Sequence, residues 1–166
     1  MITIEEFMTA DPYTLSEHNS LYHARKVMTE RHIRHIPITD NNNHLLGLIT
    51  QRDILAATDP ASKQQTKSAP DSDGRDIMLS DVMIRDISVI HKTDSLREAA
   101  LYIQSHKYGC LPVLSDDCLI GIITDSDFID IAINLLEQVE VTEDEIANEV
   151  ESEIDEVELL EFEETQ

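Results

Sequence analysis

Apolar residues recur at helical spacing in two stretches of this chain that lie 75 positions apart. Side chains three and four residues apart share one face of a helix, so each stretch predicts an amphipathic helix that packs on a core. Ser20 and Ser95 directly precede the stretches and are typical N-cap residues. The apolar positions are Leu21, Ala24, Val27 and Met28 in the first stretch and Leu96, Ala99, Ala100 and Ile103 in the second.

Two short apolar runs follow each predicted helix, and a polar turn separates the runs of each pair. This pattern favours two β-hairpins. A short extended piece precedes each helix, at residues 13–16 and 87–91, and a further helix follows each hairpin. Both halves therefore predict the order strand-helix-strand-strand-helix, which is an α+β fold. The hairpin runs are residues 36–38 and 45–49 in the first half and residues 111–114 and 119–123 in the second.

The two halves are copies of one unit. Self-similarity over such a distance indicates duplicated supersecondary structure. A unit of about 60 residues leaves a sheet face uncovered, so we expect the two copies to pack as a pseudo-two-fold pair around a shared core. Matching positions include Met8 and Met83, Pro37 and Pro112, and, after one residue is lost in a loop, Gly47 and Gly121.

The repeat divides the chain into four parts. We place the first repeat at residues 1–57 and the second at residues 77–133. Residues 58–76 form a polar linker rich in Ser, Gln and Lys. Residues 134–166 form an acidic helical tail with an amphipathic pattern.

The tail concentrates the negative charge of the chain. It holds 14 of the 34 acidic residues and no Lys or Arg, in a chain of formal charge −22. Thr142 and Glu145 predict a capping box, and an apolar stripe follows it. The stripe can pack on the repeats of its own chain, pair with a second copy, or dock on a basic partner. Its members are Ile146, Val150, Ile154 and Val157.

Composition narrows the class of protein. The strongly acidic chain lacks the basic surface that nucleic acids require, so we expect no nucleic-acid partner. No run approaches the roughly 20 apolar residues of a membrane span, and the start of the chain lacks a leader pattern, which points to a cytoplasmic protein without a membrane partner. We expect Cys110 and Cys118 to be free thiols.

No catalytic or metal-binding pattern stands out. The thiols lack a matching base and orienting group, so we do not expect an enzyme. The seven His residues are scattered, and none forms a pair at the spacing of helical metal ligands. Arg31, Arg34 and His35 favour a solvated surface over a phosphate site. We therefore predict neither a metal nor a required cofactor.

A repeated Thr-x-x-Asp motif carries the candidate chemistry. Thr50 with Asp53, and Thr124 with Asp127, each follow a glycine and two apolar residues. A helix cap alone explains such a motif. A ligand site explains it equally well, because an ionised carboxylate accepts hydrogen bonds from both hydroxyls of a ribose, and charge-assisted bonds are the stronger kind. Arg52 adds positive charge to the first copy only.

In these residues the chain resembles a tandem pair of CBS domains, the small regulatory modules named after cystathionine beta-synthase. The resemblance covers roughly residues 1–133. It rests on two copies in register, each with an apolar-Pro step and a glycine-apolar-apolar-Thr-x-x-Asp run. The matching text includes Phe7-Met8-Thr9, Ile33-Arg-His-Ile-Pro-Ile38 and Leu46-Gly-Leu-Ile-Thr50 in the first copy, and Val82-Met83, Leu111-Pro-Val113 and Gly121-Ile-Ile-Thr124 in the second.

The resemblance implies two equivalent clefts that hold an adenosine-containing ligand such as AMP, ADP, ATP or S-adenosylmethionine. The Thr and Asp residues of the motif would bind ribose and phosphate, with backbone N–H groups at the helix start assisting. The adenine would lie near the apolar-Pro steps and the first strands. Those neighbourhoods are marked by Ile36, Leu111, Thr14 and Val89.

Two functions remain open at this point. The first is a regulatory module that binds an adenosine compound and signals to a partner. The second is a ligand-free adaptor or oligomerisation module that acts through the acidic C-terminal helix. Because CBS pairs often dimerise, the resemblance also implies a homodimer, and the tail suggests a protein partner.

Overall fold

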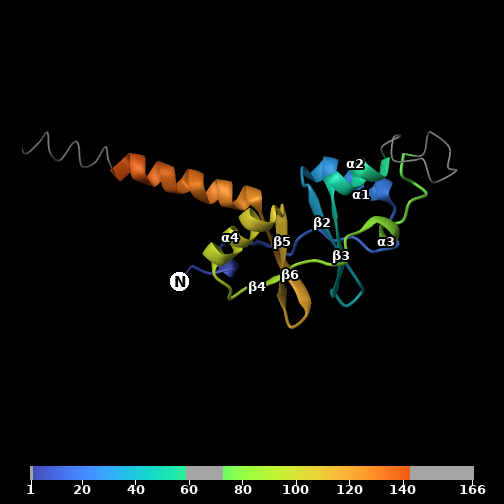
Figure 1. Ribbon diagram of the computed structural model, residues 1–166, viewed down its shortest axis with the longest axis horizontal. Helices are drawn as coiled ribbons and strands as arrows, with labels where there is room; N and C mark the ends of the chain where they lie inside the picture. Colours follow the sequence, from blue (N-terminus) through green and yellow to red (C-terminus); the bar gives the residue numbers. More distant parts are fainter. Residues whose placement is uncertain (1, 59–72, 143–166) are drawn as a thin grey trace, which may run out of the picture. The chain divides into compact units, whose positions relative to one another are not determined.

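The computed structural model describes residues 2–58 and 73–142, and the chain forms two compact units, Met1–Asp125 and Ser126–Gln166 (Figure 1). The first repeat and residues 77–125 of the second belong to the first unit, whereas residues 126–133 of the second repeat belong to the second unit. Most of the predicted linker and the predicted apolar stripe lie outside the described residues. Of the predicted capping box, Glu145 lies outside them. Thr142 lies within a helix and its hydroxyl donates to the Gln138 carbonyl at 2.8 Å, so the prediction that Thr142 begins a helix is wrong.

Each repeat has a helix, a hairpin and mixed sheet pairing, which confirms the predicted α+β fold. Ser20 and Ser95 occupy the N-cap positions of the first helix of each repeat, as predicted. The first repeat contains α1 (Leu21–Arg31), β2 (His35–Thr39), β3 (Leu45–Thr50) and α2 (Gln51–Thr58). The second contains β4 (Ile90–His91), α4 (Leu96–His106), β5 (Cys110–Ser115) and β6 (Cys118–Thr124).

The predicted first strands are shorter than expected. In the second repeat, Ile90 of β4 pairs in parallel with Val113 of β5. In the first repeat, the same position holds a single parallel bridge between Leu15 and Ile38. Each hairpin is antiparallel and shows a register shift, which falls between Ile38 and Thr39 in the first repeat.

The two repeats exchange their N-terminal segments. The strand β1 (Thr9–Ala10) pairs with β6 of the second repeat, with Thr9 opposite Ile122. Reciprocally, Ile84 pairs with Leu48 in β3 of the first repeat. Each sheet is therefore completed by residues that precede the other repeat, so neither repeat is complete without its neighbour.

Two short helices reinforce this exchange. The 3-10 helix η1 (Ile4–Glu6) docks on the second repeat, where the Ile4 N–H donates to the Asp94 carbonyl at 3.1 Å. The helix α3 (Leu79–Val82) docks on the first repeat, where the Leu79 N–H donates to the Asn19 carbonyl at 2.9 Å. The side chains of Ile4 and Leu79 are fully buried.

The same exchange explains why a glycine stands at the same place in both repeats. A Cβ atom on Gly47 would collide with the Met83 side chain, and one on Gly121 would collide with Met8. Both methionines belong to the crossing segments. The glycine that opens each Gly-x-x-Thr-x-x-Asp run therefore makes room for the exchanged chain, a packing role that needs no ligand.

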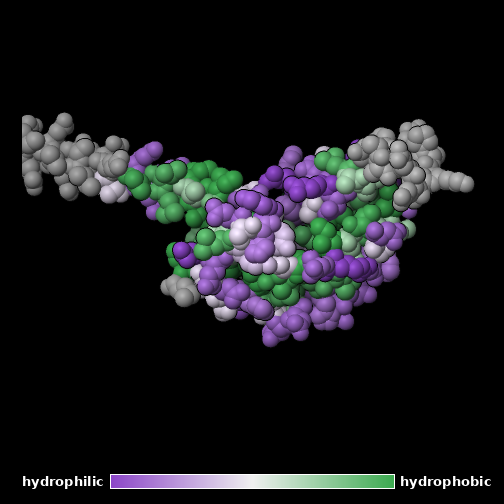
Figure 2. All heavy atoms as spheres, viewed as in Figure 1, coloured by the Kyte–Doolittle hydropathy of each residue, from purple (hydrophilic) through white to green (hydrophobic). Residues whose placement is uncertain are grey.

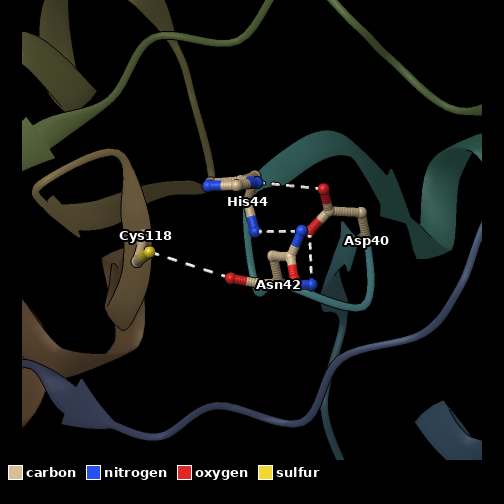
Figure 3. Close-up of polar contacts among 4 residues, drawn as sticks. All are labelled: Asp40, Asn42, His44 and Cys118. Carbon is tan, nitrogen blue, oxygen red and sulfur yellow. Dashed lines mark hydrogen bonds and ion pairs between the residues drawn. The ribbon is translucent and has the colours of Figure 1, made fainter.

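The turns of the two hairpins contact each other (Figure 3). The Asn43 side chain donates to the Leu119 carbonyl at 2.6 Å, and the Cys118 thiol lies 3.8 Å from the Asn42 carbonyl oxygen. Asp40 holds the first turn by accepting from the His44 N–H at 2.8 Å. A small apolar cluster of Leu48, Cys110 and Ile122 packs between the hairpins.

The second unit contains a helix that extends to residue 142, the last residue described. Figure 2 shows hydrophobic side chains, in green, along this helix. Within the described ranges, no helix combines the length and apolar character needed to cross a membrane. The exposed large apolar side chains of this helix are Ile129, Ile133, Leu135, Leu136, Val139 and Val141.

Candidate functional site

A cavity of about 740 Å³ lies in the first unit and is lined by both repeats. This volume is within the usual range for small-molecule sites. One wall combines the start of α2 with the start of β2. The rest of the lining comes from the second half of the first unit, namely the crossing segment at residues 84–88, the turn at residues 106–110 and Asp125.

The start of α2 presents Thr50, Arg52 and Asp53 to the cavity, as the motif predicts. Asp53 Oδ2 accepts from the Thr50 N–H at 2.8 Å and from the Thr50 hydroxyl at 2.6 Å. These bonds form a helix cap, so the capping interpretation of the motif is correct for the first repeat. The cap uses only Oδ2 of the carboxylate, and Asp53 is half-buried at the cavity wall.

Most backbone N–H groups at this helix start are already engaged. The Gln51 N–H donates to the Arg34 carbonyl at 2.9 Å, and the Asp53 N–H donates to the Thr50 hydroxyl at 3.3 Å. The Thr50 N–H is bound to Asp53. The helix start therefore offers few donors to an anion, and side chains must supply most of the positive charge.

Three bases and three acids face the cavity. The bases are Arg34, Arg52 and Lys107, and the acids are Asp53, Asp86 and Asp125. Arg34 approaches Asp125 Oδ1 to 3.6 Å; both side chains are about half exposed, but this carboxylate oxygen is itself buried. The cavity wall is thus close to neutral in a chain whose formal charge is −22.

His35 lies in the wall beside Thr50, its cross-strand neighbour. Burial lowers the pKa of His35 below its ordinary value of 6.5, and the nearby Asp125 carboxylate only partly opposes this effect. The ring is therefore neutral at pH 7. Gly109 lies against it, and a Cβ atom there would collide with the imidazole.

Arg34 and His35 are cavity residues that the sequence interpretation placed on a solvated surface. The Arg34 side chain is 57% exposed, so it lines the cavity and also contacts solvent, whereas His35 is half-buried against Gly109 of the second repeat. A signal was present in the alignment of the repeats: Gly109 stands where the first repeat has Arg34, at an offset of 75. Only a glycine leaves room there for the His35 ring.

The residues predicted near adenine do not line this cavity themselves. Ile36 and Leu111 are fully buried as the second residues of β2 and β5, but the residues before them, His35 and Cys110, line the cavity. Thr14 is half-buried and lies outside the lining. Val89 lines a second cavity of about 380 Å³, whereas its neighbour Ser88 lines the first.

The second copy of the motif spans the two units. Thr124 ends β6 in the first unit, opposite Cys110, whereas Asp127 belongs to the second unit. The proposed ligand role of Thr124 and Asp127 therefore stays a prediction. Among residues 2–58 and 73–142, no group of three or more His, Cys, Asp or Glu side chains is arranged to hold a metal ion.

The two cysteines are free, and we expect them to react very differently. Burial raises the pKa of the Cys110 thiol to about 12, with a smaller contribution from the Asp125 charge. At pH 8 nearly all of Cys110 is therefore in the thiol form, and the reactive form is the thiolate. Iodoacetamide at pH 8 should therefore modify Cys118, which is half-buried, and leave Cys110 unmodified until the chain unfolds.

Intact-mass measurement of the Cys118→Ser variant checks this expectation. The wild-type chain is first incubated until it has gained one adduct. Over the same time the folded Cys118→Ser variant should gain no adduct, and in denaturant it should gain one. Labelling of Cys110 at a rate similar to that of Cys118 would show that the thiol is not protected by burial.

The sequence of this chain matches a known protein family. The family model described as "CBS domain" matches twice, at residues 4–59 and 79–134. A CBS domain-containing protein from Dictyostelium discoideum is 30% identical over 139 residues, which cover 83% of this chain and 96% of that protein. Homoserine O-acetyltransferase from Methanobrevibacter ruminantium is 30% identical over 122 residues. That match covers 73% of this chain but only 22% of the transferase.

Solved structures share the fold. A Vibrio cholerae protein provisionally assigned to acetoin utilization (AcuB) is 45% identical, with a TM-score of 0.74, and the match covers 84% of this chain and 98% of that one. CBSX2 in complex with AMP is 24% identical, with a TM-score of 0.68 over 81% of this chain and 98% of CBSX2. The CBS domain pair of MJ0100, in complex with 5′-methylthioadenosine and S-adenosyl-L-methionine, is 21% identical, also with a TM-score of 0.68 over 81% of this chain and 98% of that one.

Proposed function

Because this chain belongs to the CBS domain family, we propose that its cavity binds an adenosine-containing ligand and that the module is regulatory. The candidates are AMP, ADP, ATP and S-adenosylmethionine. The ribose lies on Asp53, and Arg52 with Lys107 meets the first phosphate or another anionic group. In this proposal the protein acts by binding its ligand and not by catalysis.

The position of Asp53 carries this proposal. Its carboxylate lies in the wall of a cavity of about 740 Å³, and the Thr50 cap uses only Oδ2. The cap fixes the carboxylate before a ligand arrives, which reduces the entropy lost on binding. The remaining acceptor capacity suits a pair of vicinal hydroxyls, since each carboxylate oxygen accepts more than one hydrogen bond.

The charge of the cavity favours ligands with few negative charges. As many carboxylates as bases line the wall, so a triphosphate would bring four negative charges close to Asp86 and Asp125. AMP and S-adenosylmethionine fit this balance better than ATP. The related CBS structures that contain AMP, or 5′-methylthioadenosine and S-adenosylmethionine, support this choice.

Signalling follows from the shared walls of the cavity. A ligand that contacts the start of α2 and the crossing segment at residues 84–88 links the two repeats. If it binds one packing of the repeats more tightly than another, it shifts the population toward that packing. A partner protein or a second copy of the chain then responds to the change.

A thermal-shift panel tests the proposed function. AMP, ADP, ATP, NAD and S-adenosylmethionine are each added to the full chain, with inorganic phosphate as a control. A functional ligand at 100 times its dissociation constant stabilises the native state by about 2.7 kcal/mol. We expect this for AMP or S-adenosylmethionine and not for phosphate. A panel in which no adenosine compound raises the melting temperature contradicts the proposal.

The helix of residues 125–142 supports a second function, that of an adaptor or oligomerisation module. Ile129, Ile133 and Leu136 follow each other at spacings of four and three residues and are 60%, 48% and 63% exposed. Exposed apolar stripes of this kind mark contacts with other proteins. The stripe fits the predicted homodimer and also a protein partner.

Introducing one charge into this stripe separates the two functions. If the helix associates with a second copy, Leu136→Glu should lower the mass in solution from dimer to monomer, because a buried, unpaired carboxylate opposes association. Asn134→Glu adds the same charge outside the stripe and should leave the dimer intact. Light scattering after gel filtration measures the mass. A wild-type monomer, or a dimer unaffected by Leu136→Glu, argues against association through this helix.

A further inference from the structure

The helix of residues 125–142 carries a carboxylate in line with its exposed apolar side chains. Ile129, Ile133 and Leu136 follow each other at spacings of four and three residues, and Glu140 comes four residues after Leu136. Side chains at these spacings share one face of a helix, so the four residues form one line, which we call the seam. All four residues of the seam are exposed.

The seam belongs to a wide apolar face, and the opposite face of the helix is polar. Leu135 and Val139 flank the seam and are 56% and 53% exposed, and Figure 2 shows the hydrophobic side chains of this helix. Asp130, Asn134 and Gln138 lie on the opposite face, where the Asn134 side chain donates to the Asp130 carbonyl at 2.9 Å. Exposed apolar faces with a polar rim mark contacts with another molecule.

The charge of this segment indicates what kind of molecule the apolar face can contact. The helix contains five acidic residues and no Lys or Arg, and residues 143–166 add 12 acidic residues and no base. An anionic membrane or a nucleic acid would be repelled by this charge. A positively charged protein surface is attracted instead, and such complementarity selects partners and speeds their encounter.

Glu140 opposes pairing of the seam with a second copy of the chain. Whichever residue of an identical seam Glu140 meets, it meets either an apolar side chain or another Glu140. In the first case a carboxylate is buried without a partner, and in the second case two like charges face each other, so both arrangements are unfavourable. A Lys or Arg opposite Glu140 would instead donate charge-assisted hydrogen bonds to it. A single polar residue in an apolar seam selects its partner in this way.

We propose that the seam docks on a basic amphipathic helix of another protein, which places a Lys or Arg opposite Glu140. Ile129, Ile133 and Leu136 supply the apolar contact, and Glu140 decides which helix is accepted. This inference rests on the second function proposed above, that of an adaptor, and names the chemistry of its partner. It does not depend on ligand binding in the cavity of the first unit.

Three synthetic peptides test the chemistry of the partner. Each is three heptads long, carries a fluorescent label and has Lys beside its core positions. The first has one Lys and otherwise Leu in the core, the second has only Leu in the core, and the third is a scrambled version of the first. Fluorescence anisotropy measures their binding to the full chain. Because a bond between charged groups forms only with the first peptide, it should bind at least about tenfold more tightly than either of the others.

Three variants of the chain locate the contact. Glu140→Leu leaves the core Lys of the first peptide without a partner, so this variant should prefer the second peptide, which reverses the wild-type order. Leu136→Glu puts an unpaired carboxylate into the apolar contact and should weaken binding of the first peptide at least about tenfold. Asn134→Glu adds the same charge to the opposite face and should bind the first peptide as the wild-type chain does.

The mass of the chain in solution tests the role of Glu140 against self-association. Glu140→Leu completes the apolar seam, so light scattering after gel filtration should give a larger mass for this variant than for the wild-type chain. Gln138→Leu adds the same side chain to the opposite face and should leave the mass unchanged. An unchanged mass for Glu140→Leu would show that the carboxylate does not prevent pairing.

The outcomes separate this inference from the proposed function. If Leu136→Glu lowers the mass of the chain, the seam pairs with a second copy, so the basic partner is wrong and the oligomerisation function stands. If the scrambled peptide binds as tightly as the first, the attraction is one of general charge, and the proposed docking is wrong. If no peptide binds and Leu136→Glu leaves the mass unchanged, both the basic partner and the adaptor function are wrong.

Discussion

Asp53→Asn is expected to weaken the binding of an adenosine ligand about a hundredfold. In the proposed complex the carboxylate accepts two hydrogen bonds from the ribose, and bonds to a charged group contribute about 1.5–3 kcal/mol each. Asparagine keeps one carbonyl oxygen and loses the charge, so a loss of about 3 kcal/mol, or about a hundredfold, is reasonable. Titration calorimetry with AMP and S-adenosylmethionine measures the change.

The choice of asparagine separates binding from folding. Its side-chain oxygen can still accept from the Thr50 N–H, as Asp53 Oδ2 does at 2.8 Å, so the helix cap remains largely intact. The melting temperature should therefore change little. Asp86→Asn removes another carboxylate from the same cavity without touching the cap, and it should not weaken binding. Equal effects of the two variants would mean that Asp53 acts only through the general charge of the cavity.

Leu79→Ala is expected to destabilise the first repeat by about 2–5 kcal/mol, the usual cost of removing a fully buried leucine side chain. Leu79 precedes the second repeat in sequence, but its side chain is fully buried in the core cluster of the first repeat. Denaturant unfolding gives the loss of stability. Hydrogen exchange should show the largest increase in α1, although α1 and Leu79 are far apart in the sequence.

Two further variants complete this test of the exchange. Ile4 occupies the equivalent position on the other repeat and is also fully buried, so Ile4→Ala should have a similar cost. Ile2 lies two residues earlier and is 57% exposed, so Ile2→Ala should cost less than about 0.5 kcal/mol. A cost for Leu79→Ala as small as that for Ile2→Ala would contradict the exchange of the N-terminal segments.

The sequence predicts the repeats well and their exchange not at all. Each helix and hairpin has a local apolar pattern, so the α+β order is readable from one stretch of chain at a time. The strand with which β1 pairs cannot be predicted in this way. Thr9 and Ile84 lie in short segments that satisfy their hydrogen bonds on the sheet of the other repeat. A local pattern contains no information about which sheet edge a segment joins.

In the candidate site, too, some residues can be predicted from local sequence and others cannot. Thr50, Arg52 and Asp53 are predicted because a helix cap and a ribose contact need the same residue types at the same spacing. The lining residues Tyr108, Gly109 and Cys110 come from the other repeat, where the apolar-Pro step at Leu111 marks only a neighbourhood. The sequence therefore indicates the ribose end of the candidate site residue by residue and the base end only as a neighbourhood.

The central claim is that Asp53 recognises the two ribose hydroxyls of an adenosine ligand. The most direct test compares AMP with 2′-deoxy-AMP in titration calorimetry of the wild-type chain. The two compounds share base and phosphate, and a site built to bind a hydroxyl strongly rejects the analogue that lacks it. The account predicts that AMP binds at least about tenfold more tightly. Equal affinities for the two compounds would contradict it.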